Sequence, residues 1–146
     1  MSADAAEIGF LDSVLTATWQ RTGELFYAWV DPTRAPLNAV PVCRFESPLS
    51  LIDSHYFTAS ATECQFIIDR WLGTWNLELP AAFYVLLPDA NGACAASTLP
   101  VYRFFNNRQD ANQRHTIDLS VGRAMINRAW VPQGVGSNSV IFCTPI

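Results

Sequence analysis

Apolar and polar positions alternate in short blocks that predict strands grouped with helices. Residues 101–105 mix β-branched and aromatic side chains and precede an Asn-Asn turn signal, which is typical of a strand that ends in a turn. Residues 42–45 follow the same pattern. A second short strand is expected after each block, at 55–58 and 114–116, and each would return as the other arm of a hairpin across a polar loop.

A helical pattern follows each predicted hairpin. Residues 61–72 carry apolar side chains at the i, i+3, i+4 and i+7 spacing of an amphipathic helix. Ser60 stands at the expected N-cap, and Glu63 follows three residues later, as in a capping box. Weaker stripes predict short helices after Asp118 and over residues 5–12. The strongest stripe consists of Cys64, Ile67, Ile68 and Trp71.

Apolar closing strands are expected after the helices, at 25–30, 82–87 and 140–143. A tryptophan precedes each of them, which indicates a recurring core position rather than a binding platform. These tryptophans are Trp19, Trp75 and Trp130.

The order of these blocks repeats along the chain. The segment 40–45 returns 59 residues later as 99–104, and the three tryptophans are spaced by 56 and 55 residues. Such a period is typical of units that bury their apolar faces only against neighbouring units. We interpret the chain as one domain with a partial first unit, a middle unit and a last unit, covering residues 1–38, 39–98 and 99–146. The fold expected is mainly β with short helices, an α+β character and a pseudo-threefold repeat.

Composition narrows the function classes. Half of the 146 residues are hydrophobic and 15% are charged, which favours a well-packed globular domain. The net charge is −4, and the nine basic residues are scattered arginines without any lysine, so nucleic acid is not an expected partner. The longest apolar run, 81–87, is too short to span a bilayer.

The beginning of the chain has no basic and apolar secretory signal. Because the repeat places residue 1 inside a unit, we expect an upstream part to be missing from the sequence as written.

The four cysteines lack the spacing of a zinc site, so neither a metal nor another cofactor is expected. Two disulfides allow three connectivities, and we favour Cys43–Cys64 with Cys94–Cys143, because each pair joins segments of one module. This interpretation implies an extracellular or periplasmic location. The alternative is four buried thiols in a cytosolic protein.

Several polar residues could carry chemistry. His55 lacks a recognisable nucleophile motif, so a structural or ligand-contacting role is favoured over a catalytic one. His115 aligns with the aromatic Phe57 and is expected to pack. Arg44 and Arg103 recur between apolar neighbours, where a guanidinium needs a carboxylate or backbone carbonyls.

Aromatic rings beside polar groups are how proteins commonly bind sugars, because the ring covers the apolar face and the polar groups bond the hydroxyls. The rings expected to be partly exposed are Tyr27, Trp29, Tyr56, Tyr84 and Tyr102. The candidate ligand-binding residues are His55, Tyr56, Asp53, Arg44, Arg103, Asn106, Asn107 and Arg114.

The motifs VPVCRF, SHYFTASATEC, AFYVLLPDANGAC and LPVYRFFNN, with a closing tryptophan segment, resemble a bacterial repeat family known as domain of unknown function 5648. Its members typically occur in exported proteins, often beside hydrolases, and are suspected to be carbohydrate-binding modules with a β-trefoil-like arrangement of three units. The resemblance implies an accessory, non-enzymatic module that binds a glycan or cell-surface polysaccharide.

The chain departs from the family pattern in two places. The front half of the first unit is absent, and residues 113–115 read Gln-Arg-His where the family has His-Arg-Tyr. Two other hypotheses stay open: an interaction domain that docks to a parent hydrolase or other protein, and a small hydrolase using His55. Exposed aromatics along a polar groove would favour glycan binding, whereas one large apolar patch would favour docking. A cleft with a His-carboxylate-nucleophile cluster would favour catalysis.

Overall fold

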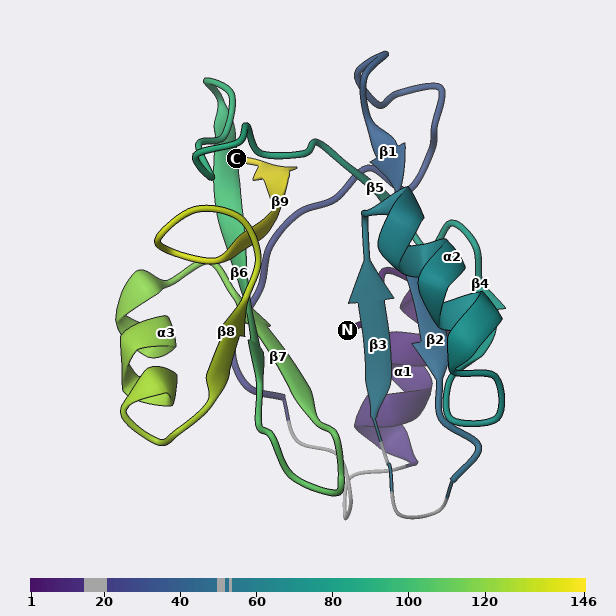
Figure 1. Cartoon of the computed structure of the whole chain (residues 1–146). Helices are drawn as coiled ribbons and strands as arrows, with labels where there is room; N and C mark the ends of the chain where they lie inside the picture. The colour runs from purple at the N-terminus through teal and green to yellow at the C-terminus, as the bar shows by residue number, and fades with distance from the viewer. Residues whose placement is uncertain (15–20, 50–51, 53) are drawn as a thin grey trace.

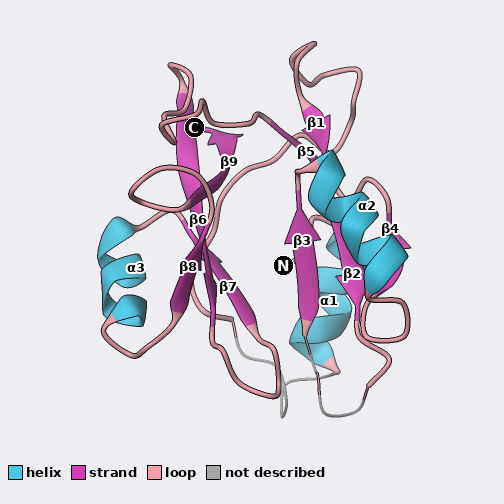
Figure 2. Ribbon diagram, viewed as in Figure 1, coloured by secondary structure: helices cyan, strands magenta, loops and turns pink. Residues whose placement is uncertain are grey.

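The computed structural model describes residues 1–14, 21–49, 52 and 54–146. Its three helices and nine strands form several antiparallel sheets, with mainly β structure (Figures 1 and 2). The mainly β class with short helices is therefore confirmed. Threefold symmetry, trefoil closure and the unit boundaries remain predictions. The helices are α1 (Ala5–Ser13), α2 (Ala61–Arg70) and α3 (Leu119–Ile126).

The middle unit forms a three-stranded sheet in the order β3-β2-β4. Cys43 pairs with Thr58 and Glu46 with His55 in the antiparallel hairpin. Helix α2 covers one face of this sheet, where Ile67 is fully buried. Helix α1 lies on the other face (Figure 1). The strands are β2 (Cys43–Glu46), β3 (His55–Thr58) and β4 (Asn76–Leu79).

The last unit forms a four-stranded sheet around its long first strand. Strand β6 pairs with β7 on one side and with both β8 and β9 on the other. Helix α3 packs beside this sheet (Figure 1). The strands are β6 (Thr98–Phe105), β7 (Gln113–Thr116), β8 (Val131–Gln133) and β9 (Val140–Pro145).

The two hairpins have corresponding registers. Arg44 pairs with Phe57 in the middle unit, and Arg103 pairs with His115 in the last. A third strand then adds beside the first, since Arg44 also pairs with Leu79 and Arg103 with Gln133. Each hairpin is thus followed by a helix and a strand that returns to its first arm.

Short pairings and an aromatic core join the two sheets. Strand β1 (Val40–Pro41) pairs with β5 (Tyr84–Val85), and isolated bridges link Trp29 to Tyr84 and Leu86 to Cys143. The central core draws on both units, which is how residues distant in sequence come together. It comprises Val42, Phe57, Ala59, Phe83, Val85, Val101 and Phe142.

Both favoured disulfides, Cys43–Cys64 and Cys94–Cys143, are present. The first ties α2 to β2, and the second ties the loop after β5 to β9. The prediction of two disulfides with this connectivity is confirmed.

Two predicted strands differ from the structure. Residues 25–30 form no strand, because their pairing is limited to the single bridge between Trp29 and Tyr84 of β5. The strand predicted at 82–87 shortens to Tyr84–Val85 plus the bridge at Leu86. The apolar character of both segments reflects packing on the central core, which Phe26 and Phe83 join.

Candidate functional site

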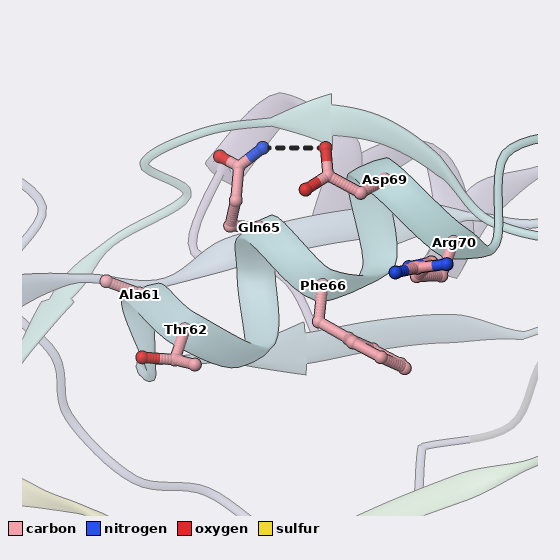
Figure 3. Close-up of a pocket in the computed structure, with 6 residues that line it drawn as sticks. All are labelled: Ala61, Thr62, Gln65, Phe66, Asp69 and Arg70. Carbon is pink, nitrogen blue, oxygen red and sulfur yellow. Dashed lines mark hydrogen bonds between the residues drawn. The ribbon is translucent and has the colours of Figure 1, made fainter.

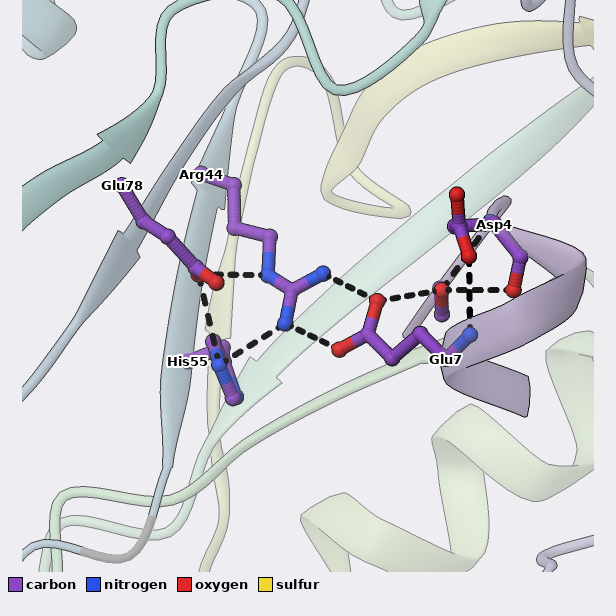
Figure 4. A network of polar contacts seen from close by, with 6 residues as sticks. Asp4, Glu7, Arg44, His55 and Glu78 are labelled. Atoms are coloured by element: carbon purple, nitrogen blue, oxygen red, sulfur yellow. Dashed lines mark hydrogen bonds and ion pairs between the residues drawn. The ribbon is translucent and has the colours of Figure 1, made fainter. Parts of the chain in front are cut away.

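Two of the predicted site residues, Arg44 and His55, meet in a network between the middle sheet and α1 (Figure 4). Arg44 Nη1 donates to Glu7 Oε2 at 2.6 Å, and Arg44 Nη2 bonds the other oxygen of the same carboxylate. Arg44 Nε lies 2.7 Å from Glu78 Oε2. His55 Nε2 lies 3.0 Å from Arg44 Nη2 and 3.4 Å from Glu78 Oε2. A guanidinium with only 6% of its side chain exposed is thereby neutralised by two carboxylates.

The electrostatics of this network are dominated by the Arg44 guanidinium and by burial. Hydrogen bonds from Arg44 lower the pKa of Glu7 to about 2, with Ser2 adding a further donor. Burial raises the pKa of Glu78, and Arg44 only partly offsets that effect. His55 contacts two charged groups of the network, Arg44 and Glu78.

Two more predicted residues, Tyr56 and Arg103, meet in a second network. Arg103 bonds the Glu63 carboxylate with both terminal nitrogens, at 2.9 and 3.1 Å, and donates to the Phe57 carbonyl at 3.0 Å. The Tyr56 hydroxyl donates to the same carboxylate at 2.7 Å, and the guanidinium lies 5.0 Å from the centre of the Tyr56 ring. Arg103 reaches from the last unit to a helix of the middle unit.

Burial shifts the pKa values of Tyr56 and Glu63 in this second network. Burial raises the pKa of Tyr56, whose exposed fraction is only 6%. Burial also raises the pKa of Glu63, but the bonds from Arg103 outweigh it, and the net pKa is lowered. The expectation of a partly exposed Tyr56 ring is wrong, because the ring packs edge-on against Trp75 under α2. Tyr102 is buried as well, whereas Tyr27 is exposed.

The two arginine networks have the same arrangement of a strand arginine and a helix glutamate. In each, an arginine on the first hairpin strand pairs with the glutamate three residues after a helix N-cap, Glu7 after Asp4 or Glu63 after Ser60. The expectation that Arg44 and Arg103 pair with carboxylates or backbone carbonyls is confirmed. Through these contacts each arginine links its strand to a helix.

The remaining predicted residues lie in or near the hairpin loops. Asn106 is buried and closes its own loop, with Nδ2 donating to Asp110 at 2.6 Å and Oδ1 accepting from two backbone N–H groups. Asn107 is exposed in the same loop, with a positive φ of 53°. Arg114 is half-buried on β7. Asp53 lies outside the described residues, as does Trp19.

His115 packs as expected. Its ring stacks on Phe142 with centroids 6.2 Å apart and meets Phe57 edge-on at 5.9 Å. Burial lowers its pKa well below the usual value, so the ring is neutral at pH 7. Nε2 has no hydrogen-bond partner among the described residues.

The solvent face of α2 is open, and six side chains of the helix line it (Figure 3). Gln65 Nε2 donates to Asp69 Oδ1 at 2.9 Å on one side of the helix, and Phe66 points to the other side. Phe66 is 49% exposed and meets Trp71, itself 42% exposed, edge-on at 5.5 Å. The lining residues are Ala61, Thr62, Gln65, Phe66, Asp69 and Arg70.

The sequence reasoning missed this surface. Trp71 was assigned to the buried stripe of the helix, but it is the C-cap residue, where the chain leaves the helix and the ring turns outward. Phe66 stands off that stripe, between the buried Cys64 and Ile67. An aromatic residue on the polar side of a predicted helix was the signal that could have located this surface.

The family model described as domain of unknown function (DUF5648) matches residues 3–140. The chain belongs to this family. Searches of curated proteins and of solved structures return no match. Within the described residues of this DUF5648 chain, no helix is long and apolar enough to cross a bilayer. The same residues contain no group of three or more His, Cys, Asp or Glu side chains able to hold a metal ion.

Proposed function

We propose that this chain is a non-catalytic module that binds carbohydrate through the exposed face of α2. The observation that carries the proposal is the half-exposed Phe66 ring on this face, where it meets the exposed Trp71 edge-on. A ring of this kind covers the apolar C–H face of a sugar, and the polar groups beside it bond the hydroxyls.

The polar groups on the exposed face of α2 complement sugar hydroxyls. Asp69 has one carboxylate oxygen bonded to Gln65, which leaves its second oxygen as an acceptor. Arg70 is exposed and offers donors in a planar fork. Hydroxyl groups donate and accept at once, so a site with both kinds of partner suits them.

The polar networks at Arg44 and Arg103 support a structural role for several residues first considered for ligand binding. Both guanidiniums are nearly buried and already paired with carboxylates. A ligand contacting them would have to break a buried ion pair, which is costly. We therefore place the binding surface on α2 rather than on these arginines.

The two disulfides favour an extracellular or periplasmic setting for this module. Surface polysaccharides and secreted hydrolases share that setting. The proposal of an accessory module beside a hydrolase rests on this compartment and on the family resemblance.

A glycan array tests the proposal, using the oxidised protein, Phe66→Ala and the control Ile126→Ala. Phe66 and Ile126 are almost equally exposed, at 49% and 48%, on α2 and α3. We expect glycan binding that falls at least tenfold in Phe66→Ala and is unchanged in Ile126→Ala. If the wild type binds no glycan on the array, or if all three proteins bind equally, the proposal is contradicted.

A second candidate function is docking to another protein. Leu72, Leu77 and Leu79 are exposed beyond the helix, and β4 is an edge strand of its sheet. Edge strands and exposed apolar residues are common features of protein contacts. Failure of the array together with a stable complex formed with a partner hydrolase and lost in Leu77→Asp would favour this alternative.

A further inference from the structure

We infer that one end of the last unit binds an acidic polysaccharide, a chain that carries carboxylate or sulfate groups. Four arginines lie at this end, and none of them forms an ion pair with a described residue. This surface is separate from the exposed face of α2, so the inference goes beyond the proposed function and does not depend on it. We call it the basic end, and its arginines are Arg108, Arg114, Arg123 and Arg128.

The charges of the chain are divided unevenly. Residues 99–146 contain five arginines and two aspartates, a net charge of +3, whereas residues 1–98 contain four arginines and eleven acidic residues, a net charge of −7. Of the five arginines in the last unit, Arg103 is paired with Glu63 of the middle unit. The other four make the last unit positive in an otherwise acidic chain, which directs a polyanion toward it.

The sheet register places two of these arginines at the tip of the hairpin. Phe105, the last residue of β6, pairs with Gln113, the first residue of β7. Arg108 lies in the loop that joins these two strands, and Arg114 follows Gln113 directly. Arg108 and Arg114 therefore belong to the same end of the sheet.

Helix α3 brings the other two arginines to the same end. Arg123 lies in the last turn of α3, and Arg128 follows the helix, three residues before Val131 at the start of β8. Val131 pairs with Phe105, so β8 begins at the hairpin tip. In Figure 1 the C-terminal end of α3 and the loop between β6 and β7 both lie at the lower end of the last unit.

Arg114 faces α3 and has no counter-charge. It pairs with Phe104, and opposing residues of an antiparallel pair lie on the same face of the sheet. The Phe104 ring lies against Gly122 of α3, so Arg114 is on the face beside this helix. Its side chain is half-buried, and Nε is buried without a hydrogen-bond partner among the described residues. An anionic group on a ligand would supply the missing counter-charge.

The middle unit has the opposite arrangement at the corresponding positions. Tyr56 stands where the last unit has Arg114, and its hydroxyl donates to Glu63, three residues after the helix N-cap. In α3 the residue three positions after the N-cap is Val121. The last unit thus gains a cation and lacks the carboxylate of the helix, so the basic end is particular to this unit.

The loop that carries Arg108 is held in one shape. The side-chain oxygen of the buried Asn106 accepts from the backbone N–H groups of Arg108 and Asn112, at 3.2 and 3.1 Å. The exposed Asn107 stands beside Arg108 and offers an amide to sugar hydroxyls. A preformed loop loses little conformational entropy on binding.

The chemistry of the basic end favours a polysaccharide over a nucleic acid. A guanidinium bonds a carboxylate or a sulfate through two parallel N–H groups. Single-stranded nucleic acids are held largely by bases stacked on aromatic rings. In the last unit, all of which the structure describes, no aromatic side chain is exposed, and Trp130 is half-buried. The two disulfides also favour the compartment in which surface polysaccharides occur.

Calorimetry of the oxidised protein tests this inference. The probes are a heparin hexasaccharide for sulfate groups, hexagalacturonate for carboxylate groups, the neutral cellohexaose and an oligothymidylate of similar length. We expect at least one acidic hexasaccharide to bind at low salt and to lose affinity at least tenfold at high salt. The acidic probe that binds more tightly assigns the anionic group. Oligothymidylate should bind more weakly than that probe.

Variants locate the binding. Arg108→Gln with Arg128→Gln changes two exposed side chains and should weaken binding of the acidic hexasaccharide at least tenfold. The matched control is Arg21→Gln with Arg34→Gln, which removes the same charge from exposed arginines outside the last unit and should change affinity less than twofold. Phe66→Ala, on the exposed face of α2, should leave binding of the acidic probe unchanged.

The outcomes separate this inference from the proposed function. If neither acidic hexasaccharide binds, if the control pair loses as much affinity as the test pair, or if oligothymidylate binds most tightly, the inference is overturned. Loss of acidic binding in Phe66→Ala, with none in Arg108→Gln and Arg128→Gln, would overturn it while supporting a carbohydrate site on α2. If Phe66→Ala leaves every glycan on the array unaffected but the arginine pair abolishes acidic binding, the proposed function fails and this inference stands.

Discussion

The middle and last units have the same order of strand, strand, helix and strand, but they hold their helices by different means. In the middle unit Cys64 of α2 forms a disulfide with Cys43 of β2. At the corresponding place in α3 stands Gly122, and the ring of Phe104 lies so close that an added Cβ would come within 2.6 Å of it. One helix is fastened covalently, and the other by the close approach of a ring.

The outer faces of α2 and α3 also differ from each other. The buried positions of α2 and α3 match, since Cys64 and Ile67 correspond to Gly122 and Met125. The exposed Phe66 of α2 corresponds to Ala124 of α3. The inner faces of both helices therefore maintain the fold, whereas the exposed aromatic pair of Phe66 and Trp71 is found only on α2 of the two helices.

The largest expected effect comes from breaking the link between the two units. Arg103→Met removes the bonds from the guanidinium to the Phe57 carbonyl and to Glu63. Because Glu63 is then partly buried without a counter-charge, we expect a loss of about 3 kcal/mol in the free energy of unfolding. Urea denaturation measures it. Arg103→Met with Glu63→Gln should recover about half of the loss. A loss below about 1 kcal/mol in the single variant would mean that the pair behaves as an ordinary surface ion pair.

Removing the covalent anchor of α2 should follow closely. Cys43→Ser with Cys64→Ser opens a loop of 21 residues in sequence separation and should cost about 3 kcal/mol in the free energy of unfolding. Hydrogen exchange should then show lost protection in α2, while α3 keeps its protection. Equal loss of protection in both helices would contradict the view that they are anchored separately.

Filling the space at Gly122 should disturb the packing of α3 against Phe104. Gly122→Val places methyl groups against the buried Phe104 ring, and overpacking of this kind should cost about 2 kcal/mol. Ala124→Val, on the exposed face of α3, has the same β-branched side chain and serves as the control for helix propensity. If both variants unfold at the same denaturant concentration, the contact with Phe104 does not hold the helix.

The smallest expected effect concerns the two hairpins, where His115 of the last unit corresponds to Phe57 of the middle unit. The buried neutral His115 has a pKa well below 6.5 in the folded state, so only the unfolded chain takes up its proton as the pH falls. Stability is therefore lost below pH 6.5, by about 1 kcal/mol between pH 6.5 and 5.5. His115→Phe should remove this part of the pH dependence in denaturation curves. Parallel pH profiles for the two proteins would contradict the assignment.

Local pattern predicted much of the fold. The residues 55–58 form β3 as expected, the helix expected at 61–72 is α2, and Ser60 caps it. The strands β4 and β8 were not predicted, because they are short, partly polar and exposed, and they become strands only by pairing with β2 and β6. Pairing across the chain leaves no local signal in such segments.

The candidate site was less predictable. The sequence indicated that Arg44 and Arg103 needed acidic partners, but not which of the thirteen acidic residues supplied them. Glu7 and Glu63 are 37 and 40 residues away from their arginines. The choice depends on where a helix N-terminus meets a neighbouring strand.

The sequence by itself determined the family and the hairpin and helix order, and it favoured the two disulfide pairs and the packing role of His115. These features depend on spacing and side-chain chemistry that survive in a one-dimensional pattern. Only the tertiary structure decided that Tyr56 is buried, that Phe66 and Trp71 face solvent, and that one surface of α2 is open. Exposure is the area that the rest of the chain leaves uncovered, so it cannot be read from one segment alone.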